Sequence, residues 1–327
     1  MDLRTNYLDI DLKNPIVPSL EGTIGCLLDD MKRLEDAGAA AVVTSPVFQE
    51  QFTDKDDELD TFFSNVDDHK EVSKYLPHSI TYKLEPEKHL NLITQAKRSL
   101  SIPIIGSLNG TMPGSWLRFA KNIEDAGADA LELNIYYMPT DTSLLNNDIE
   151  KRYIEILASV KQLIRIPVAM RLTPYFSSLS NFAWKLVNAG ADGLVLFNRF
   201  YGANIDCKKL ELDHTFSLNK PDDIELSLNW TAILSTKLKC SFAALSGIHS
   251  VTEIIKMIMS GSDVAILCSA VAKSEPNFLK TILNDLINWM SENNYISVKE
   301  MKGKMNQKTI TNHFAYERAN YIKLMCQ

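Results

Sequence analysis

Polar side chains end a series of short apolar stretches, and these are the residues whose types could do chemistry. Nearly all of them are hydroxyls, amides or glycines, and one, Arg171, is a cation. A ring of amides and hydroxyls suits a large neutral heterocycle that forms hydrogen bonds, and a guanidinium beside it would stabilise negative charge appearing on that heterocycle. The set consists of Ser19, Thr44, Ser45, Ser107, Asn109, Asn134, Arg171, Asn198, Ser246, Gly247 and Ser269.

The same set argues against several other kinds of chemistry. No lysine ends one of these apolar stretches, which disfavours a Schiff-base aldolase. No two neighbouring stretches end in carboxylates, which disfavours a glycosidase or an enolase-type metal site. The five cysteines form no CxxC pair and the six histidines form no HxxxH or HExxH motif, so we expect no metal site.

A repeated pattern leads up to four of these polar ends. The segments "RLEDAGAAAVVTS", "NIEDAGADALELN", "KLVNAGADGLVLFN" and "MIMSGSDVAILCS" each read as the end of a helix, a glycine turn and an apolar strand. Gly38, Gly127, Gly190 and Gly261 fit the left-handed position that ends a helix. The strands are nearly continuous apolar runs, as expected for a parallel sheet that is covered on both faces.

Four more strands complete the pattern, beginning near Asn14, Ile102, Ile166 and Cys240. Eight strands that alternate with helices over about 250 residues predict an α/β fold, a TIM (β/α)8 barrel, in which the carboxyl ends of all strands meet at one face. A doubly wound open sheet is the alternative. It is disfavoured because "PSLEGTIGCLLDD", after the first strand, lacks a GxGxxG turn.

We expect one domain over residues 1–327, with the barrel core at about residues 14–290. Outside the barrel lie an N-terminal hairpin, a charged insertion after the second strand at about 46–87, and a hairpin after the sixth strand at about 199–229. A C-terminal helical extension occupies residues 291–327. The first insertion is long enough to form a lid or an edge over the active face.

The strand "LELN" carries two polar residues in an apolar run. Strand alternation places Glu132 and Asn134 on one face and the two leucines on the other, so the polar pair points into the barrel if the leucines face the helices. A buried carboxylate requires a partner, and Arg171 on the next strand is the candidate. We therefore favour a structural role for Glu132.

The last two strands end in small residues that precede helices. "LSGIHS" contributes Ser246, Gly247 and Ile248, and "LCSAV" contributes Ser269 and Ala270. Their backbone N–H groups could bind a phosphate at the place where barrels commonly bind one. The alternative is that small residues simply let each turn pack closely.

Composition limits the partners. The net charge is −7 and no dense run of Lys and Arg occurs, which makes nucleic acid and anionic membrane poor partners and favours a small-molecule substrate. The charged N-terminus has no apolar signal region, and no later segment has the roughly 18 apolar residues of a spanning helix. We expect a cytoplasmic protein.

The ordered motifs resemble a known family. The opening "YLDIDLKNPIVPS", the strands "ADALELN" and "IPVAMRLTP", the segment "FNRF" and the paired small-residue turns resemble the class 1 dihydroorotate dehydrogenases. "SLNGTMPGSW", "LELNIYYMPTD", "VLFNRFY" and "YERANY" are more similar to the dihydroorotate dehydrogenase-like proteins of that family. The resemblance covers nearly the whole chain and implies an FMN-binding TIM barrel, an oxidoreductase of pyrimidine biosynthesis and a homodimer.

The resemblance also implies a site for FMN. Ser19, Thr44, Ser45, Asn109 and Asn134 would meet the isoalloxazine ring and the ribityl chain. Arg171 stands in place of the family's strand-end lysine, near N1 and the C2 carbonyl of the flavin. The remaining cofactor positions are Asn198 on the substrate side and Ser246, Gly247, Ile248, Ser269 and Ala270 around the phosphate, with Asn109, Asn134 and Asn198 also expected to contact substrate.

One departure from the family concerns catalysis. The family follows the fourth strand with a Cys or Ser base, whereas this chain has "IYYMP", so Tyr137 occupies that position. A tyrosine hydroxyl is a weak base at neutral pH but a competent proton donor. Tyr137 and Arg171 are thus the predicted catalytic residues, and packing is the alternative role for the tyrosine pair.

Three functions remain open at this point. The first is an FMN-dependent oxidoreductase acting on CH–CH bonds of a dihydroorotate-like or other activated small molecule. The second is a catalytically impaired FMN-binding protein that lacks the family's Cys or Ser base. The third is a phosphate-binding barrel enzyme without flavin, such as an isomerase.

Overall fold

The chain forms a closed barrel of parallel strands. The computed structural model describes residues 1–21, 27–52, 86–198, 204–213, 220–274 and 277–326. In barrel order the strands are β3 (Ile16–Pro18), β4 (Val42–Val43), β6 (Ile104–Gly110), β7 (Ala130–Ile135), β8 (Val168–Leu172), β9 (Gly193–Leu196), β12 (Ser241–Ala244) and β13 (Val264–Leu267). β13 pairs with β3, and the barrel closes where Ser19 bridges Val43 and the Leu20 N–H donates to the Val43 carbonyl at 3.0 Å. The predicted TIM barrel is confirmed.

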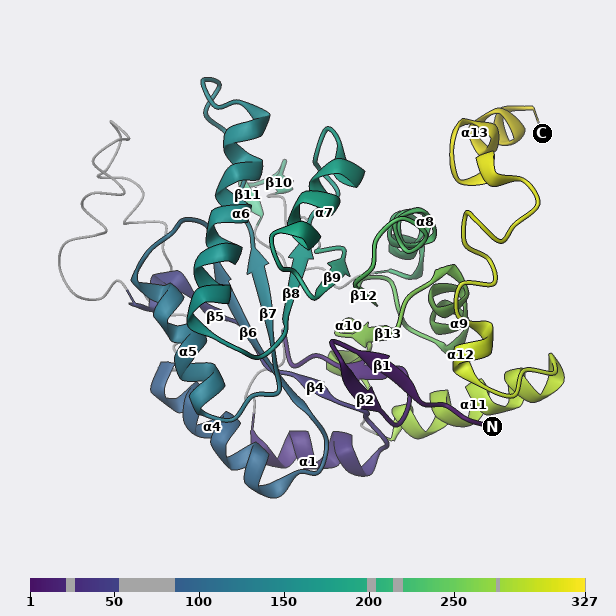
Figure 1. The fold of residues 1–327 in the computed structure, drawn as a ribbon, viewed down its shortest axis with the longest axis horizontal. Coiled ribbons are helices and arrows are strands. Elements are labelled where there is room, and N and C mark those ends of the chain that lie inside the picture. Colours follow the sequence, from purple (N-terminus) through teal and green to yellow (C-terminus); the bar gives the residue numbers. More distant parts are fainter. Residues whose placement is uncertain (22–26, 53–85, 199–203, 214–219, 275–276, 327) are drawn as a thin grey trace.

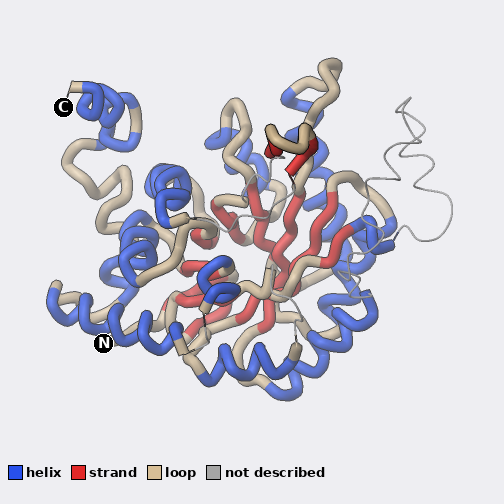
Figure 2. The backbone as a smooth tube through the Cα atoms, turned by 180° about the vertical axis from the view of Figure 1, so that it is seen from behind, coloured by secondary structure: helices blue, strands red, loops and turns tan. Residues whose placement is uncertain are grey.

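Helices surround the strands on the outside, as Figures 1 and 2 show. They are α1 (Leu28–Asp36), α4 (Pro86–Ser99), α5 (Arg118–Asp125), α6 (Asn146–Leu163), α7 (Leu179–Asn188), α8 (Ile224–Leu234), α9 (Val251–Ser260) and α11 (Phe278–Glu292), whereas the short α10 (Ser269–Lys273) directly follows β13. On α6 the buried residues Ile149, Tyr153, Ile156 and Val160 recur every three or four positions, which gives the helix one apolar face. The predicted glycine turns are also present, because Gly38, Gly127, Gly190 and Gly261 have φ values of +104°, +100°, +104° and +126°.

Strand alternation divides the apolar core into two parts. Leu131 and Leu133 of β7 belong to the larger part, which includes the buried residues of the helices. Ala130 of β7, Ala169 of β8 and Ile105 of β6 belong to the smaller part inside the barrel. Residues two positions further along each strand therefore also point to the barrel interior, which is the orientation predicted for Glu132 and Asn134.

The predicted N-terminal hairpin plugs the amino end of the barrel. It consists of β1 (Thr5–Tyr7) and β2 (Ile10–Leu12), and its turn residue Leu8 is buried with the inner core. The Leu8 N–H donates to the Ser241 hydroxyl at 2.9 Å, at the start of β12. A Cβ atom on Gly193, the first residue of β9, would lie 2.7 Å from the Leu8 side chain. The hairpin closes this end, so the opposite end remains for a ligand.

The other segments outside the barrel agree with the prediction where they are described. After β4 come β5 (Val47–Phe48) and the 3-10 helix η1 (Gln49–Phe52), and most of the insertion at about 46–87 lies outside the described residues. β10 (Asn204–Asp206) and β11 (Glu211–Asp213) form the antiparallel hairpin after β9, although part of the 199–229 segment is likewise outside them. The remaining elements are η2 (Ser115–Leu117), η3 (Pro221–Asp223), α12 (Val298–Met301), η4 (His313–Tyr316) and α13 (Arg318–Met325).

The C-terminal extension is anchored to the barrel. Val298 and Met301 of α12 are buried, and the Lys302 ammonium pairs with the Asp263 carboxylate just before β13. None of the helices in the described ranges is long and apolar enough to cross a membrane. The assignment of the chain to one domain stays a prediction.

Candidate active site

Three predicted site residues form one row across the carboxyl end of the barrel. Asn109 of β6 lies opposite Asn134 of β7, and Asn134 lies opposite Arg171 of β8 in the strand register. Adjacent parallel strands are about 4.8 Å apart, so these side chains are neighbours. All three are buried. The barrel thus brings together side chains that are up to 62 residues apart in the sequence.

Hydrogen bonds continue this row to the next strand. Arg171 Nη2 donates to Asn198 Oδ1 at 2.8 Å, and Asn198 Nδ2 donates to Asn134 Oδ1 at 2.9 Å. Asn198 follows β9, and its backbone N–H donates to the Leu172 carbonyl at 2.7 Å. These bonds fix the orientation of both amides, so the part of the row from β7 to β9 is held in place before any ligand binds.

Arg171 also lies between two carboxylates. Its Nη1 donates to Glu21 Oε2 at 2.5 Å and to Glu132 Oε1 at 3.4 Å. The predicted pairing of Glu132 with Arg171 is therefore confirmed. Ser107 supports the same carboxylate, because its hydroxyl donates to Glu132 Oε1 at 3.4 Å.

Sequence reasoning missed Glu21. This residue follows β3 and reaches Arg171 across a sequence separation of 150 residues. The signal in the sequence was a carboxylate only two positions beyond Ser19, next to a predicted strand end. Burial of the Arg171 side chain would lower its pKa, but attraction to Glu21 and Glu132 outweighs burial and raises the pKa above its ordinary value.

The charge state of Glu132 reflects two opposing effects. Burial raises the pKa of this carboxyl and nearby Arg171 lowers it, with a net increase. The guanidinium therefore stabilises a carboxylate in a place where it would otherwise favour its protonated form. One donor of Arg171, Nε, is buried and has no hydrogen-bond partner among the described residues.

The hydroxyls after β3 and β4 form hydrogen bonds at the strand ends. Ser19 Oγ accepts from the Glu21 N–H at 3.3 Å, and Ser45 Oγ donates to the Leu20 carbonyl at 2.8 Å. Thr44 Oγ1 accepts from the Ser107 N–H at 3.1 Å. These three predicted site residues thus support the rim of the barrel, and Ser19 and Ser45 do so at Glu21 and its neighbour Leu20.

Sequence reasoning also missed His89 on α4. Its Nε2 lies 3.4 Å from Thr44 Oγ1, and its ring centroid lies 6.5 Å from that of Phe119. Burial lowers the pKa of His89 to about 4, so the imidazole is neutral at pH 7. A lone histidine in an apolar helix pattern carried no signal for this contact.

The two small-residue turns lie side by side because β12 and β13 are adjacent. Ser246 and Gly247 both have left-handed φ values, +76° and +71°, and the Ser246 hydroxyl donates to the Phe197 carbonyl at 3.0 Å. A Cβ atom on Gly247 would lie 2.4 Å from the backbone nitrogen of Ile224. Ile248 is buried beside this turn.

The second turn leads into α10, which begins at Ser269 and Ala270. Backbone N–H groups in the first turn of a helix have no acceptor within that helix, and they favour an anion. The predicted phosphate contacts of both turns are thus brought together in space. Their role in binding stays a prediction.

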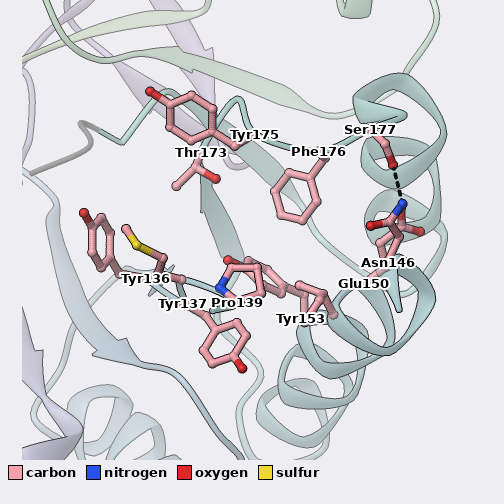
Figure 3. A pocket seen from close by; sticks show the side chains of 12 residues that line it. Tyr136, Tyr137, Pro139, Asn146, Glu150, Tyr153, Thr173, Tyr175, Phe176 and Ser177 are labelled. Carbon is pink, nitrogen blue, oxygen red and sulfur yellow. Dashed lines mark hydrogen bonds between the residues drawn. The ribbon is translucent and has the colours of Figure 1, made fainter. Parts of the chain in front are cut away.

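Tyr137 lies on the outer side of the strand wall. Its ring packs against the outer core, and the Arg152 guanidinium carbon lies 4.2 Å from the ring centroid. In Figure 3 the rings of Tyr136 and Tyr137 lie on different sides of the chain. This placement favours a packing role for the Tyr137 ring, and its predicted catalytic role stays a prediction.

Fold and site together define a barrel protein with a ring of buried amides, hydroxyls and one guanidinium at its carboxyl end. No family model matches the sequence. The chain is 26% identical over 327 residues to the dihydroorotate dehydrogenase B (NAD(+)) catalytic subunit of Endomicrobium trichonymphae, covering 94% of this chain and 98% of that protein.

A second relative is the protein of the same name from Bacillus thuringiensis (strain Al Hakam). It is 25% identical over 236 residues, which cover 68% of this chain and 74% of that protein. The counterpart in Bacillus cereus (strain AH187) matches to the same extent. These relatives confirm the resemblance to the class 1 dihydroorotate dehydrogenase family that the sequence motifs indicate.

Proposed function

We propose that this protein is an FMN-dependent oxidoreductase that acts on the CH–CH bond of a dihydroorotate-like small molecule in pyrimidine biosynthesis. The observation that carries the proposal is the buried row Asn109, Asn134, Arg171 and Asn198 at the carboxyl end of the barrel. The relatives are named as catalytic subunits, which favours an enzyme over the impaired FMN-binding protein.

The residues present fit an isoalloxazine ring. Its pyrimidine half has several carbonyl and nitrogen acceptors, and Arg171 Nε is a buried donor that lacks a partner among the described residues. Ser19, Thr44, Ser45, Asn109 and Asn134 would hold the ring and the ribityl chain. Ser246, Gly247, Ile248, Ser269 and Ala270 would hold the phosphate through backbone N–H groups.

FMN, when bound, would supply the acceptor for a hydride from the substrate. Arg171 stays charged because its carboxylate partners raise its pKa, so it would stabilise negative charge on the ring and would not release a proton. Glu21 and Glu132 orient the guanidinium. The amides of Asn109, Asn134 and Asn198 would bind the substrate, and those of Asn134 and Asn198 are already oriented by their hydrogen bonds.

A separate group must handle the substrate proton. We propose Tyr137, which occupies the position of the family's base, as a relay that passes the proton leaving the substrate to water; its hydroxyl would act as donor only in the reverse reaction, the reduction of an activated alkene. Tyr136 is the matched comparison, since the two rings leave the chain on different sides. Tyr137→Phe is expected to retain FMN and to slow turnover by about 10²-fold, the usual contribution of general acid–base catalysis. If Tyr136→Phe slows turnover and Tyr137→Phe does not, the role belongs to Tyr136.

An ultraviolet–visible spectrum of the purified protein tests the proposal. We expect a flavin absorbance band, or its appearance on titration with FMN, and loss of that band when dihydroorotate is added without oxygen. Protein that stays colourless after FMN is added would contradict the proposal and favour a flavin-free barrel enzyme. Bound flavin that neither dihydroorotate nor a panel of dihydro-heterocycles reduces would favour the impaired binding protein.

We also propose that the protein is a homodimer, as the family resemblance implies. Light scattering on the purified protein should give twice the chain mass of 36.8 kDa. A monomeric mass at micromolar concentration would refute this proposal.

A further inference from the structure

A cavity of about 430 Å³ lies beside the candidate active site. It is formed by the chain that follows β7, the chain that follows β8, and the first turns of α6, as Figure 3 shows. We call it the aromatic pocket. Its lining includes Tyr136, Ile149, Tyr153, Thr173, Tyr175 and Phe176.

The inner wall of the aromatic pocket is preformed. The Phe176 ring packs edge-on against Tyr153, with 5.4 Å between centroids, and lies 4.2 Å from the Phe182 centroid. The Tyr153 hydroxyl donates to the Ile135 carbonyl at 2.9 Å, which ties this wall to the end of β7. Packed aromatic rings of this kind offer a rigid apolar face to a flat ligand.

The outer rim contains an aromatic side chain that is mostly in water. Tyr175 is 70% exposed. In Figure 3 Thr173 and Tyr175 lie across the pocket from Pro139. A ligand in the pocket would cover part of the Tyr175 ring, and this burial of apolar surface would add to binding.

Three polar side chains of the pocket already have partners. The carboxylate of Glu150, 9% exposed, pairs with Lys185 Nζ at 2.7 Å. Asn146 Nδ2 donates to Ser177 Oγ at 3.1 Å. The described residues that line the pocket include no lysine, arginine or histidine, and the two nearby cations are engaged with lining side chains, Lys185 with the Glu150 carboxylate and Arg152 with the Tyr137 ring. The lining itself therefore favours a neutral ligand.

The aromatic pocket starts where two strands of the active site end. Tyr136 is two residues beyond Asn134, and Thr173 is two residues beyond Arg171. We infer that the pocket binds a neutral, planar, apolar ring next to the heterocycle at the strand ends. This ring is either a substituent of the substrate or a separate molecule. The inference rests on the proposed function only for the identity of the neighbouring ligand.

Titration with 1-aminoanthracene, a neutral planar fluorophore that brightens in apolar surroundings, tests the inference on FMN-saturated protein. We expect saturable binding, a Kd about fivefold higher in Tyr175→Ala because one stacking contact is lost, and no saturable binding in Thr173→Trp, which fills the pocket. Tyr321→Ala is the matched control, since Tyr321 is 64% exposed on α13 and should leave the Kd unchanged.

The result that would overturn the inference is absence of saturable binding, or equal Kd values in the wild type and Thr173→Trp. Circular dichroism of each variant shows whether it is folded. If Thr173→Trp does not fold, Tyr175→Ala still tests the pocket, because Tyr175 is exposed and its replacement should not disturb the fold. Adding orotate to the probe complex shows whether the bound ring is part of the substrate or a separate molecule. Displacement of the probe supports a substituent of the substrate, and simultaneous binding supports a separate molecule. A flavin band with no probe binding refutes only the pocket, whereas probe binding to colourless protein refutes only the proposed function.

Discussion

Replacing Arg171 with methionine tests the electrostatic design of the site. Methionine keeps a long unbranched side chain but removes the charge between Glu21 and Glu132, whose side chains are 20% and 3% exposed. Breaking a buried ion pair by removing one partner costs about 3–5 kcal/mol because it leaves an uncompensated charge. Two carboxylates lose their partner here, and Glu132 has almost no access to water. We therefore expect Arg171→Met to lose about 4 kcal/mol of unfolding free energy at pH 7.

Two further variants separate this effect from lost packing. Arg171→Lys keeps the cation and should cost clearly less than Arg171→Met. Glu132→Gln alone leaves Arg171 paired with Glu21 and should cost about 1 kcal/mol. The double variant Arg171→Met/Glu132→Gln should be more stable than Arg171→Met, because the most buried unpaired charge is gone.

Urea unfolding followed by circular dichroism measures these differences, and pH supplies a second test. Burial raises the folded-state pKa of Glu132 above its ordinary value. The contribution of Glu132 to the unfolding free energy is therefore most favourable at a pH below the ordinary pKa of a glutamate, and it declines as the pH rises. Without Arg171 this decline should be steeper, so the deficit of Arg171→Met should shrink between pH 7 and pH 5. A deficit under about 1 kcal/mol at pH 7, or no recovery in the double variant, would refute the reasoning.

Two other predictions concern residues that hold the site. Burial lowers the pKa of His89 to about 4 from an ordinary 6.5. The unfolding free energy should therefore fall by up to about 3 kcal/mol as the pH drops from 6.5 to 4. His89→Gln should reduce this pH dependence of the unfolding free energy, measured by urea unfolding. A slope that persists in His89→Gln would assign it to other groups. Gly247→Ala should lower stability by about 1–3 kcal/mol and weaken FMN binding, because a Cβ at φ +71° would meet the Ile224 backbone. Gly114→Ala, without a positive φ, is the matched control, and equal melting temperatures for both variants would contradict this prediction.

The barrel and the row of site residues were predictable because both depend on local pattern. Each strand is a short apolar run, four of them after a glycine turn, and most site residues are the polar residues that end such a run. Alternation with a period of two then decided that Glu132 and Asn134 point inward. The pairing of Glu132 with Arg171 followed from adjacent strands and from the cost of an unpaired buried charge.

Tertiary structure alone decided the contacts that join distant segments outside the regular strands. Glu21 meets Arg171 across 150 residues of sequence from a position just beyond β3, where no sequence period predicts the direction of a side chain. The sides taken by Tyr136 and Tyr137 depend on the backbone after β7, where strand alternation no longer applies. The aromatic pocket likewise forms only when the ends of β7 and β8 and the start of α6 come together. Its shape depends on packing between these elements, which no single stretch of the sequence specifies.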